Sequence, residues 1–325
     1  MEKIDAVILW VDGDDTTWRQ QMLKYANKGM DCSANHFRDW GLLKYWFRSI
    51  EKNASWINKI HFVTWGHIPE WLDDSNPRIN IVKHEDFMPK EFLPTFNSNA
   101  IEINLYRIKG LSEKFILFND DVFLINKTSQ EDFFRKGKPM DVLIEAPVIP
   151  EENIFYKTLF NNLAVINKHY NKSQIVKRKG YYSLRYGKFA FSSWIESHHR
   201  GFVGFMNPHI TTPFLKAAFK KLWEMEPEKC VETSSSRFRS ESNITQYLVR
   251  YIQLLDNNFL PRRMNFGKSI ELHDGVNYER ILGGKEKVIC LNDSDLNMNF
   301  NMEKKRLSSQ LQKLFPDKSQ YERNI

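Results

Sequence analysis

The stretch Lys114-Phe-Ile-Leu-Phe-Asn-Asp-Asp-Val-Phe123 decides the fold of this chain. Its apolar run, residues 115–118, predicts a buried strand that stops at two adjacent carboxylates, Asp120 and Asp121. Ligands of α/β proteins bind at such strand ends, and carboxylate oxygens suit a hard divalent cation, Mg²⁺ or Mn²⁺. Asn-Asp-Asp is also ordinary turn chemistry. Because adjacent residues of an extended chain point to opposite faces, we expect only one of the two carboxylates to be a direct metal ligand.

Strand and helix patterns alternate around this stretch through the first 125 residues. We expect strands at 4–11, 60–65 and 79–82 and helices at 41–53 and 100–109. The alternation predicts an α/β fold with a mostly parallel sheet flanked by helices. In a parallel sheet the polar groups that follow the strands share one edge, where we expect the active site: Asp12-Gly13-Asp14, Thr64-Trp65-Gly66-His67, His84-Glu85-Asp86 and Asn119-Asp120-Asp121.

The formal charge of +7 over 325 residues is concentrated in one segment. No Asp or Glu occurs between residues 153 and 195, where the basic residues are Lys157, Lys168, Lys172, Lys177, Arg178, Lys179, Arg185 and Lys188. The rest of the chain is nearly neutral, which argues against nucleic-acid binding and for one localised anionic partner.

Apolar residues also recur near helical spacing at the start of this segment, at Phe155, Leu159, Leu163, Ile166 and Tyr170. Two interpretations follow. Either a basic amphipathic helix lies on an anionic membrane surface, or the helix packs on the core with a solvated basic face.

Composition bounds the class of protein and its compartment. The 42% hydrophobic content supports a folded core, and three cysteines without a C-x-x-C spacing indicate a reducing compartment. The first apolar stretch is short and contains Asp5, so we expect no signal peptide, and no apolar run is long enough to span a membrane. We expect a cytoplasmic protein, free or peripheral at the inner face of the membrane. The tail from Met302 predicts a packing helix followed by a frayed charged end.

The order of motifs in residues 4–124 closely resembles the first two signature regions of the Stealth family, and residues 205–295 resemble the third and fourth regions more loosely. The motifs that carry this resemblance are Asp5-Ala-Val-Ile-Leu-Trp-Val-Asp-Gly-Asp14, Arg38-Asp39, Gly66-His-Ile-Pro-Glu-Trp-Leu72, Leu93-Pro-Thr-Phe-Asn-Ser-Asn-Ala-Ile-Glu102, Asn119-Asp120-Asp121, Asn207-Pro208-His209-Ile210, Thr233-Ser-Ser-Ser-Arg-Phe-Arg239 and Cys290-Leu-Asn-Asp293. Stealth proteins are hexose-1-phosphate transferases of capsular and cell-wall polysaccharide synthesis, so the resemblance implies a fold like that of glycosyltransferase type A.

The resemblance also implies a reaction. A hexose-1-phosphate, for example N-acetylhexosamine-1-phosphate, would pass from a UDP-linked nucleotide-sugar to a hydroxyl of a growing lipid-linked glycan, and UMP would leave. One catalytic domain, 1–325, would comprise a nucleotide-sugar half (1–150), a basic helical insertion (151–200) and a completing half with the C-terminal helix (201–325). The alternatives are an ordinary metal-dependent glycosyltransferase that releases UDP, and a non-catalytic membrane-surface or glycan-binding module.

Roles for single residues follow from the same resemblance. His209 is the favoured general base, because it lies in a loop context and histidine titrates near neutrality, and Arg239 is expected to grip the pyrophosphate as a planar fork. The expected metal ligands are Asp120, Asp121, Glu102 and Asp293. The expected substrate-binding residues are Asp12, Gly13, Asp14, Arg38, Asp39, Asn97, Ser98, Asn99 and Arg237.

Several of these residues also have a purely structural interpretation. Asn97 or Ser98 can be an ordinary helix N-cap, and Arg38 and Asp39 can be a charge partner and a cap. The chain departs from the family at Ser242-Asn243, where relatives tend to carry an acid, and this puts a metal role there in doubt.

Overall fold

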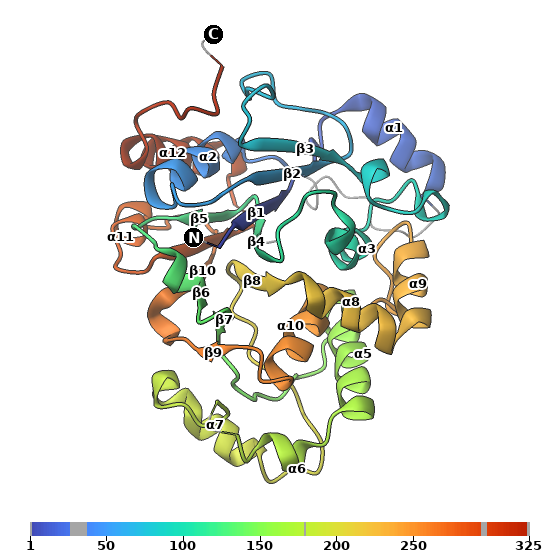
Figure 1. Cartoon of the computed structure of the whole chain (residues 1–325). Coiled ribbons are helices and arrows are strands. Elements are labelled where there is room, and N and C mark those ends of the chain that lie inside the picture. Colours follow the sequence, from blue (N-terminus) through green and yellow to red (C-terminus); the bar gives the residue numbers. More distant parts are fainter. Residues whose placement is uncertain (1, 27–37, 179, 294–297, 324–325) are drawn as a thin grey trace.

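The computed structural model describes residues 2–26, 38–178, 180–293 and 298–323, and a five-stranded sheet forms the centre of this part of the chain (Figure 1). Its strand order is β3-β2-β1-β4-β8. Strands β1 (Ile4–Leu9), β2 (Ile60–Thr64), β3 (Ile79–Lys83) and β4 (Lys114–Asn119) are parallel, and β8 (Thr212–Leu215) is antiparallel to β4. The expected α/β class with a mostly parallel sheet is confirmed.

Two smaller sheets flank the central one. Strand β5 (Val122–Leu124) pairs antiparallel with β11 (Val288–Asn292), which pairs parallel with β10 (Gly267–Glu271). Strands β6 (Phe134–Arg135), β7 (Lys138–Asp141) and β9 (Leu260–Pro261) form the other. Only Asp120 and Asp121 separate β4 from β5, so the chain passes from one sheet to another at these two carboxylates.

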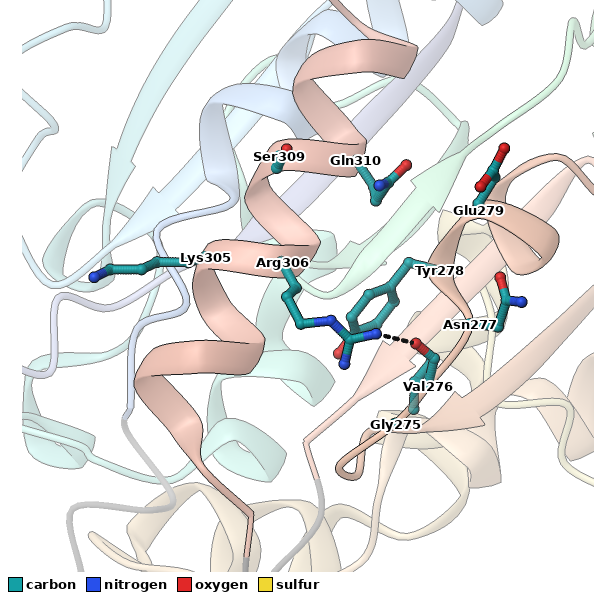
Figure 2. Close-up of a pocket in the computed structure, with 9 residues that line it drawn as sticks. All are labelled: Gly275, Val276, Asn277, Tyr278, Glu279, Lys305, Arg306, Ser309 and Gln310. Carbon is teal, nitrogen blue, oxygen red and sulfur yellow. Dashed lines mark hydrogen bonds between the residues drawn. The ribbon is translucent and has the colours of Figure 1, made fainter.

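The C-terminal region packs against the N-terminal half of the molecule. Helix α12 (Phe300–Leu314) buries Leu307 and Leu311, and the expected packing helix is confirmed. The prediction of a frayed end after this helix is wrong for the chain up to residue 322. Tyr321 is buried, and Glu322 forms an ion pair with Arg48 at 2.7 Å. A pocket of about 590 Å³ lies between α12 and α11 (Tyr278–Leu282), and Figure 2 shows Arg306 donating to the Val276 carbonyl beside it.

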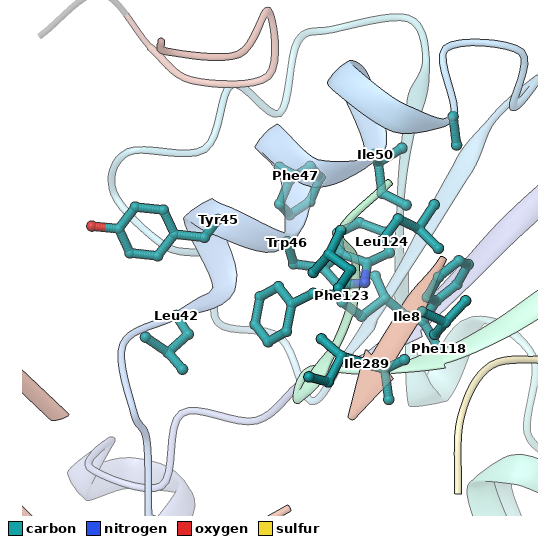
Figure 3. Close-up of a cluster of buried hydrophobic side chains, with 14 of the residues drawn as sticks. Ile8, Leu42, Tyr45, Trp46, Phe47, Ile50, Phe118, Phe123, Leu124 and Ile289 are labelled. Atoms are coloured by element: carbon teal, nitrogen blue, oxygen red, sulfur yellow. The ribbon is translucent and has the colours of Figure 1, made fainter. Parts of the chain in front are cut away.

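The apolar core beside the central sheet comes from the helix predicted at 41–53, which is α2 (Leu43–Asn53). Its residues Trp46, Phe47 and Ile50 are buried against Phe118, the last apolar residue of β4 (Figure 3). The rings of Trp46 and Phe118 lie 5.3 Å apart at 83°, an edge-to-face contact. This packing fixes β4 and therefore the position of the carboxylates that follow it.

The remaining helices cover the sheet or lie beyond it (Figure 1). The helix expected at 100–109 is α3 (Ser98–Asn104), which begins earlier because Asn97 caps it and continues as a 3-10 turn before Gly110, whose φ of +80° favours glycine. The others are α1 (Thr16–Tyr25), α4 (Gln130–Phe133), α8 (Lys216–Met225), α9 (Pro227–Ser235) and α10 (Gln246–Leu255). None of the helices in the described ranges is long and apolar enough to cross a membrane.

The basic segment forms α5 (Ile154–His169), α6 (Lys172–Ile175) and α7 (Phe189–Glu196). The residues Leu159, Leu163 and Ile166 of α5 are buried, and α5 contacts α10. For α5, therefore, the structure favours the interpretation of a helix packed on the core. Figure 1 places α6 and α7 at the end of the molecule away from the central sheet.

Candidate active site

The carboxyl ends of the parallel strands meet at one edge of the sheet, as the sequence predicts. The backbone N–H of Asp12, after β1, donates to Nε2 of His67, after β2, at 2.7 Å. His84 follows β3. Burial and then the neighbouring imidazole of His67 lower the pKa of His84 to about 4, so the loop after β3 lies close to the loop after β2. A pocket of about 260 Å³ at this edge is lined by Trp10, Asp12, Asp39, Gly41, Leu43, Lys44, Pro69, Glu70 and Trp71.

The Asp12-Gly13-Asp14 group forms a turn at this edge. The Asp12 carboxylate accepts from the backbone N–H of Asp14 at 2.9 Å. Asp14 is exposed and pairs with Arg19 at 3.0 Å, while Arg19 also donates to the Gly13 carbonyl. Asp12 therefore faces the pocket, whereas the Asp14 carboxylate is already partnered by α1.

The second cluster forms where β4 passes into β5. Ligand atoms of Asp121, His209 and Cys290 lie within 4.8 Å of one another. The Cys290 thiol donates to Oδ2 of Asp121 at 3.2 Å, and Oδ1 of Asp121 is buried without a hydrogen-bond partner among the described residues. An unpaired buried carboxylate oxygen is costly, so this geometry suits a bound cation.

The two adjacent aspartates are in different surroundings. Asp121 is half-buried against β11, where its carbonyl accepts from the Leu291 N–H at 2.9 Å, and Asp120 is exposed. Desolvation by the protein around it, then the carboxylates of Asp121 and Asp39, raise the pKa of Asp120 to about 7. Burial likewise raises the pKa of Asp121, against the opposing effects of His209 and the Cys290 thiol. Two carboxylates with raised pKa values at one strand end are typical of a metal or catalytic site.

Arg38 and Asp293, 255 positions apart in sequence, form an ion pair next to this cluster. The guanidinium donates to both oxygens of Asp293, at 2.6 and 2.9 Å, and Nε1 of Trp40 donates to Oδ2 at 2.9 Å. Both oxygens of Asp293 are thus engaged by the protein itself. This arrangement disfavours the expected role of Asp293 as a metal ligand and the expected role of Arg38 in gripping the substrate.

The start of α3 is held by Asn97. Its side chain accepts from the Asn99 N–H at 3.1 Å and donates to the Ser236 carbonyl at 2.9 Å and to Asn243 at 2.8 Å. The structural interpretation therefore accounts for Asn97: it is an N-cap that also binds the loop after α9. Asn243, at the departure from the family pattern, is the partner of this cap.

The Arg-Phe-Arg loop is anchored by its central residue. Phe238 stacks on Phe96 with ring centroids 5.4 Å apart, and the two arginines on either side contact different parts of the protein. Arg237 lies over the ring of Tyr25 at 4.7 Å, whereas exposed Arg239 donates to Oγ of Ser98 at 2.9 Å. Burial raises the pKa of Glu102 to about 7, and the charge of Arg239 opposes that shift, which puts Glu102 near this guanidinium.

Sequence reasoning missed one residue of the site. Cys290 was identified only as part of a motif, because a cysteine in a strand is usually a core residue.

Comparison with known proteins identifies the family. Residues 2–30 match Stealth protein CR1, conserved region 1, and residues 36–142 match Stealth protein CR2, conserved region 2. The capsular polysaccharide phosphotransferase WcwK of Streptococcus pneumoniae is 39% identical, and the alignment covers 99% of each chain. The chain belongs to the Stealth family. The exopolysaccharide phosphotransferase cps2G of Lactiplantibacillus plantarum is 36% identical over 98% of this chain and 96% of that one. This Stealth protein is accordingly an enzyme of the transferase class.

Solved structures are more distant from this Stealth protein. The galactosyltransferase LgtC, in complex with donor and acceptor sugar analogs, has 11% sequence identity and a TM-score of 0.41 and covers 95% of each chain. The glycosyltransferase GlyE of Streptococcus pneumoniae TIGR4 has 10% identity and a TM-score of 0.37, covering 99% of this chain and 66% of that one. The function of the Stealth protein is therefore argued from its sequence relatives and its own geometry.

Proposed function

We propose that this Stealth protein transfers a hexose-1-phosphate from a nucleotide-sugar, UDP-linked, to a hydroxyl of a growing lipid-linked glycan in capsular or cell-wall polysaccharide synthesis. The acceptor oxygen attacks the phosphorus that carries the sugar, and the bond from that phosphorus to the bridging oxygen breaks. UMP leaves, and a phosphodiester links the hexose to the glycan. The observation that carries this proposal is the cluster of Asp121, His209 and Cys290, with Oδ1 of Asp121 unpaired, at the edge where the parallel strands end.

The donor set fits a divalent cation, Mg²⁺ or Mn²⁺. Oδ1 of Asp121 has no other partner among the described residues, and the adjacent, exposed Asp120 offers a further carboxylate. Burial raises the pKa of the Cys290 thiol, which donates to Oδ2 of Asp121 beside Oδ1. When bound, such a cation neutralises charge on the pyrophosphate. We leave Asp293 out of the metal shell because Arg38 and Trp40 engage it.

The protein's own groups then have separate roles. His209 is exposed next to Asp121 and accepts the proton of the acceptor hydroxyl. Arg239 is exposed and uses only one side of its guanidinium for Ser98, so its remaining N–H groups can bind phosphate oxygens. The pocket of Trp10, Trp71, Asp12 and Asp39 receives the nucleoside, since indole rings stack on a base and carboxylates accept from ribose hydroxyls.

The division of the chain follows from these assignments. Residues 1–150 supply Asp120 and Asp121, while residues 201–325 supply His209, Arg239 and Cys290. Neither half holds the whole cluster, so we infer one catalytic domain with 151–200 as an insertion. We place the reaction in the cytoplasm, at the inner face of the membrane.

Product analysis tests the proposal. The protein is incubated with Mn²⁺ or Mg²⁺, a panel of nucleotide-sugars and a glycan acceptor, and the products are weighed by mass spectrometry. We expect UMP and an acceptor heavier by a hexose phosphate. Release of UDP with an acceptor heavier by a hexose alone would instead identify an ordinary glycosyltransferase, and no turnover of any nucleotide-sugar would favour a binding module.

A further inference from the structure

An apolar face is exposed at the end of the molecule away from the central sheet. Phe191, Trp194 and Ile195 of α7 are 63%, 52% and 46% exposed, and Leu184, in the 3-10 turn before α7, is 96% exposed. Spacings of three and four residues put the three α7 side chains on one face of the helix. The rings of Phe191 and Trp194 stack at 5.4 Å and 19°. We call Leu184, Phe191, Trp194 and Ile195 the α7 patch.

The opposite face of α7 fixes this orientation. The Glu145 N–H donates to Oγ of Ser193 at 2.9 Å, and Ser192 donates to the Glu145 carbonyl at 2.9 Å. At the end of the helix, buried Lys172 donates to the Glu196 carbonyl at 2.5 Å and pairs with the Glu145 carboxylate at 2.7 Å. Ser192 and Ser193 therefore point inward, whereas Phe191 and Trp194 point outward. The helix cannot turn to bury these two rings without breaking this network.

Charge around the patch is positive, though less than the sequence indicates. Three lysines of the basic segment are paired with acids from elsewhere: Lys157 with Glu241, Lys168 with Glu226 and Lys172 with Glu145. Arg178 donates to the Leu255 carbonyl, and Lys179 lies outside the described residues. No ion pair forms on Lys177, Arg185 or Lys188 within the described ranges. Two of these, Arg185 and Lys188, lie between Leu184 and Phe191 in sequence.

We propose that the α7 patch docks on an anionic lipid surface. Its aromatic and aliphatic side chains enter the boundary between headgroups and acyl chains, where Trp and Phe are favoured, and Arg185 and Lys188 contact headgroup phosphates. A second copy of the chain is a poorer occupant, because a two-fold contact through this patch would bring the same basic side chains together. The docking surface is thus an apolar face with basic neighbours, and the Lys177-Arg178-Lys179 run is not its main part. This inference goes beyond the transfer reaction and does not depend on it.

Co-sedimentation of the full chain with vesicles tests the proposal directly. Vesicles of phosphatidylcholine with phosphatidylglycerol should pellet the protein, and vesicles of phosphatidylcholine alone should pellet much less. Replacing both Trp194 and Phe191 by Ser should weaken this binding by about 100-fold or more, since each buried apolar side chain contributes about tenfold or more. The matched control replaces Val231 and Met302 by Ser, because both are 45% exposed and lie on other helices, α9 and α12. It should bind like the parent.

Two further variants separate the apolar from the basic contribution. Arg185→Ala with Lys188→Ala should weaken binding by roughly tenfold on phosphatidylglycerol vesicles. Trp194→Phe keeps an apolar ring, so this variant should still bind the vesicles. Brominated lipid should quench part of the tryptophan fluorescence of the parent, and this quenching should be lost in the variant. Equal pelleting of the Trp194/Phe191 variant and the parent would overturn the proposal. So would a dimer in light scattering that this variant converts to a monomer, because the patch would then be covered by a second copy.

Discussion

Asp121 is the residue on which the candidate site depends most. One carboxylate oxygen accepts from the Cys290 thiol, and the other is buried with no partner in the described part of the chain. The sequence predicted the two carboxylates at the end of β4, because an apolar run followed by acids is a local pattern. It could not predict Cys290 as their neighbour, since that contact joins residues 169 positions apart.

The metal assignment predicts a large effect of removing the charge of Asp121. Asp121→Asn should lower turnover by about 100-fold or more and abolish the heat of Mn²⁺ binding in titration calorimetry, while circular dichroism stays unchanged. Asp120→Asn should also lower turnover strongly. The control is Glu131→Gln, an exposed carboxylate on α4 that lies 3.6 Å from Arg135. Full activity of the parent in EDTA would refute the assignment.

The general-base assignment predicts a separate change in kinetics. His209→Ala should lower kcat by roughly 10²–10⁴-fold with little change in donor affinity, because the base acts on the acceptor hydroxyl. His273→Ala, which removes an exposed histidine, is the control. A His209→Ala enzyme that keeps its kcat at saturating Mn²⁺ but binds Mn²⁺ more weakly would make His209 a metal ligand instead.

The two arginines of the Arg-Phe-Arg loop should differ in effect. Arg239→Lys keeps the charge but loses the planar fork, so it should raise the donor KM by about tenfold. Arg237→Lys should matter less for the donor, because Arg237 lies over Tyr25. Steady-state kinetics with the donor varied checks both variants, and an Arg239→Lys enzyme with normal constants contradicts the proposed grip.

At the scale of elements, strands and helices with a clear apolar period could be predicted from the sequence. The residues at which they end could not always be predicted. The helix α2 matches its prediction because four apolar residues recur at helical spacing. The chain end after α12 does not, because Tyr321 and Glu322 dock through contacts with Phe47 and Arg48, far away in sequence. Asn97 shows the same limit: a cap is visible in the sequence, but its bonds to the loop 236–243 are not.

Strand β1 carries a buried carboxylate whose pKa predicts a pH effect on stability. Burial raises the pKa of Asp5, but hydrogen bonds from His61, Asn58 and the Ser112 N–H outweigh it and lower the pKa overall. A carboxyl whose pKa is lowered by folding stabilises the fold at pH values above its pKa in the unfolded chain, which is near 4. This stabilisation is lost as the pH falls through the pKa of the folded state. Asp5→Asn should cost about 1–3 kcal/mol at pH 7. In denaturant unfolding, the difference in unfolding free energy between the variant and the parent should stay constant above about pH 5 and shrink below about pH 4. A difference that widens in acid would contradict this account.

At the scale of the whole molecule, long-range contacts join the N-terminal half to the last third of the chain. Arg38 and Asp293 are one such contact, half-buried and bidentate. A double-mutant cycle of Arg38→Ala and Asp293→Ala should give a coupling energy of about 1–2 kcal/mol in thermal unfolding without Mn²⁺. If Asp293 instead ligates metal, Asp293→Ala would reduce Mn²⁺ affinity and the coupling would be near zero.

The turn at Asp120 and Asp121 also bears on how the protein is made. Strands β1 to β4 can form once about the first 125 residues have left the ribosome, since domains fold during synthesis from the N-terminus. Strand β5 must wait for its partner β11, which ends at Asn292, because the register pairs Val122 with Cys290. The nascent chain therefore carries its acidic turn uncompleted while the residues between β5 and β11 are made. Because Cys290 belongs to β11, we expect the cluster of Asp121, His209 and Cys290 to form only after that strand has been added.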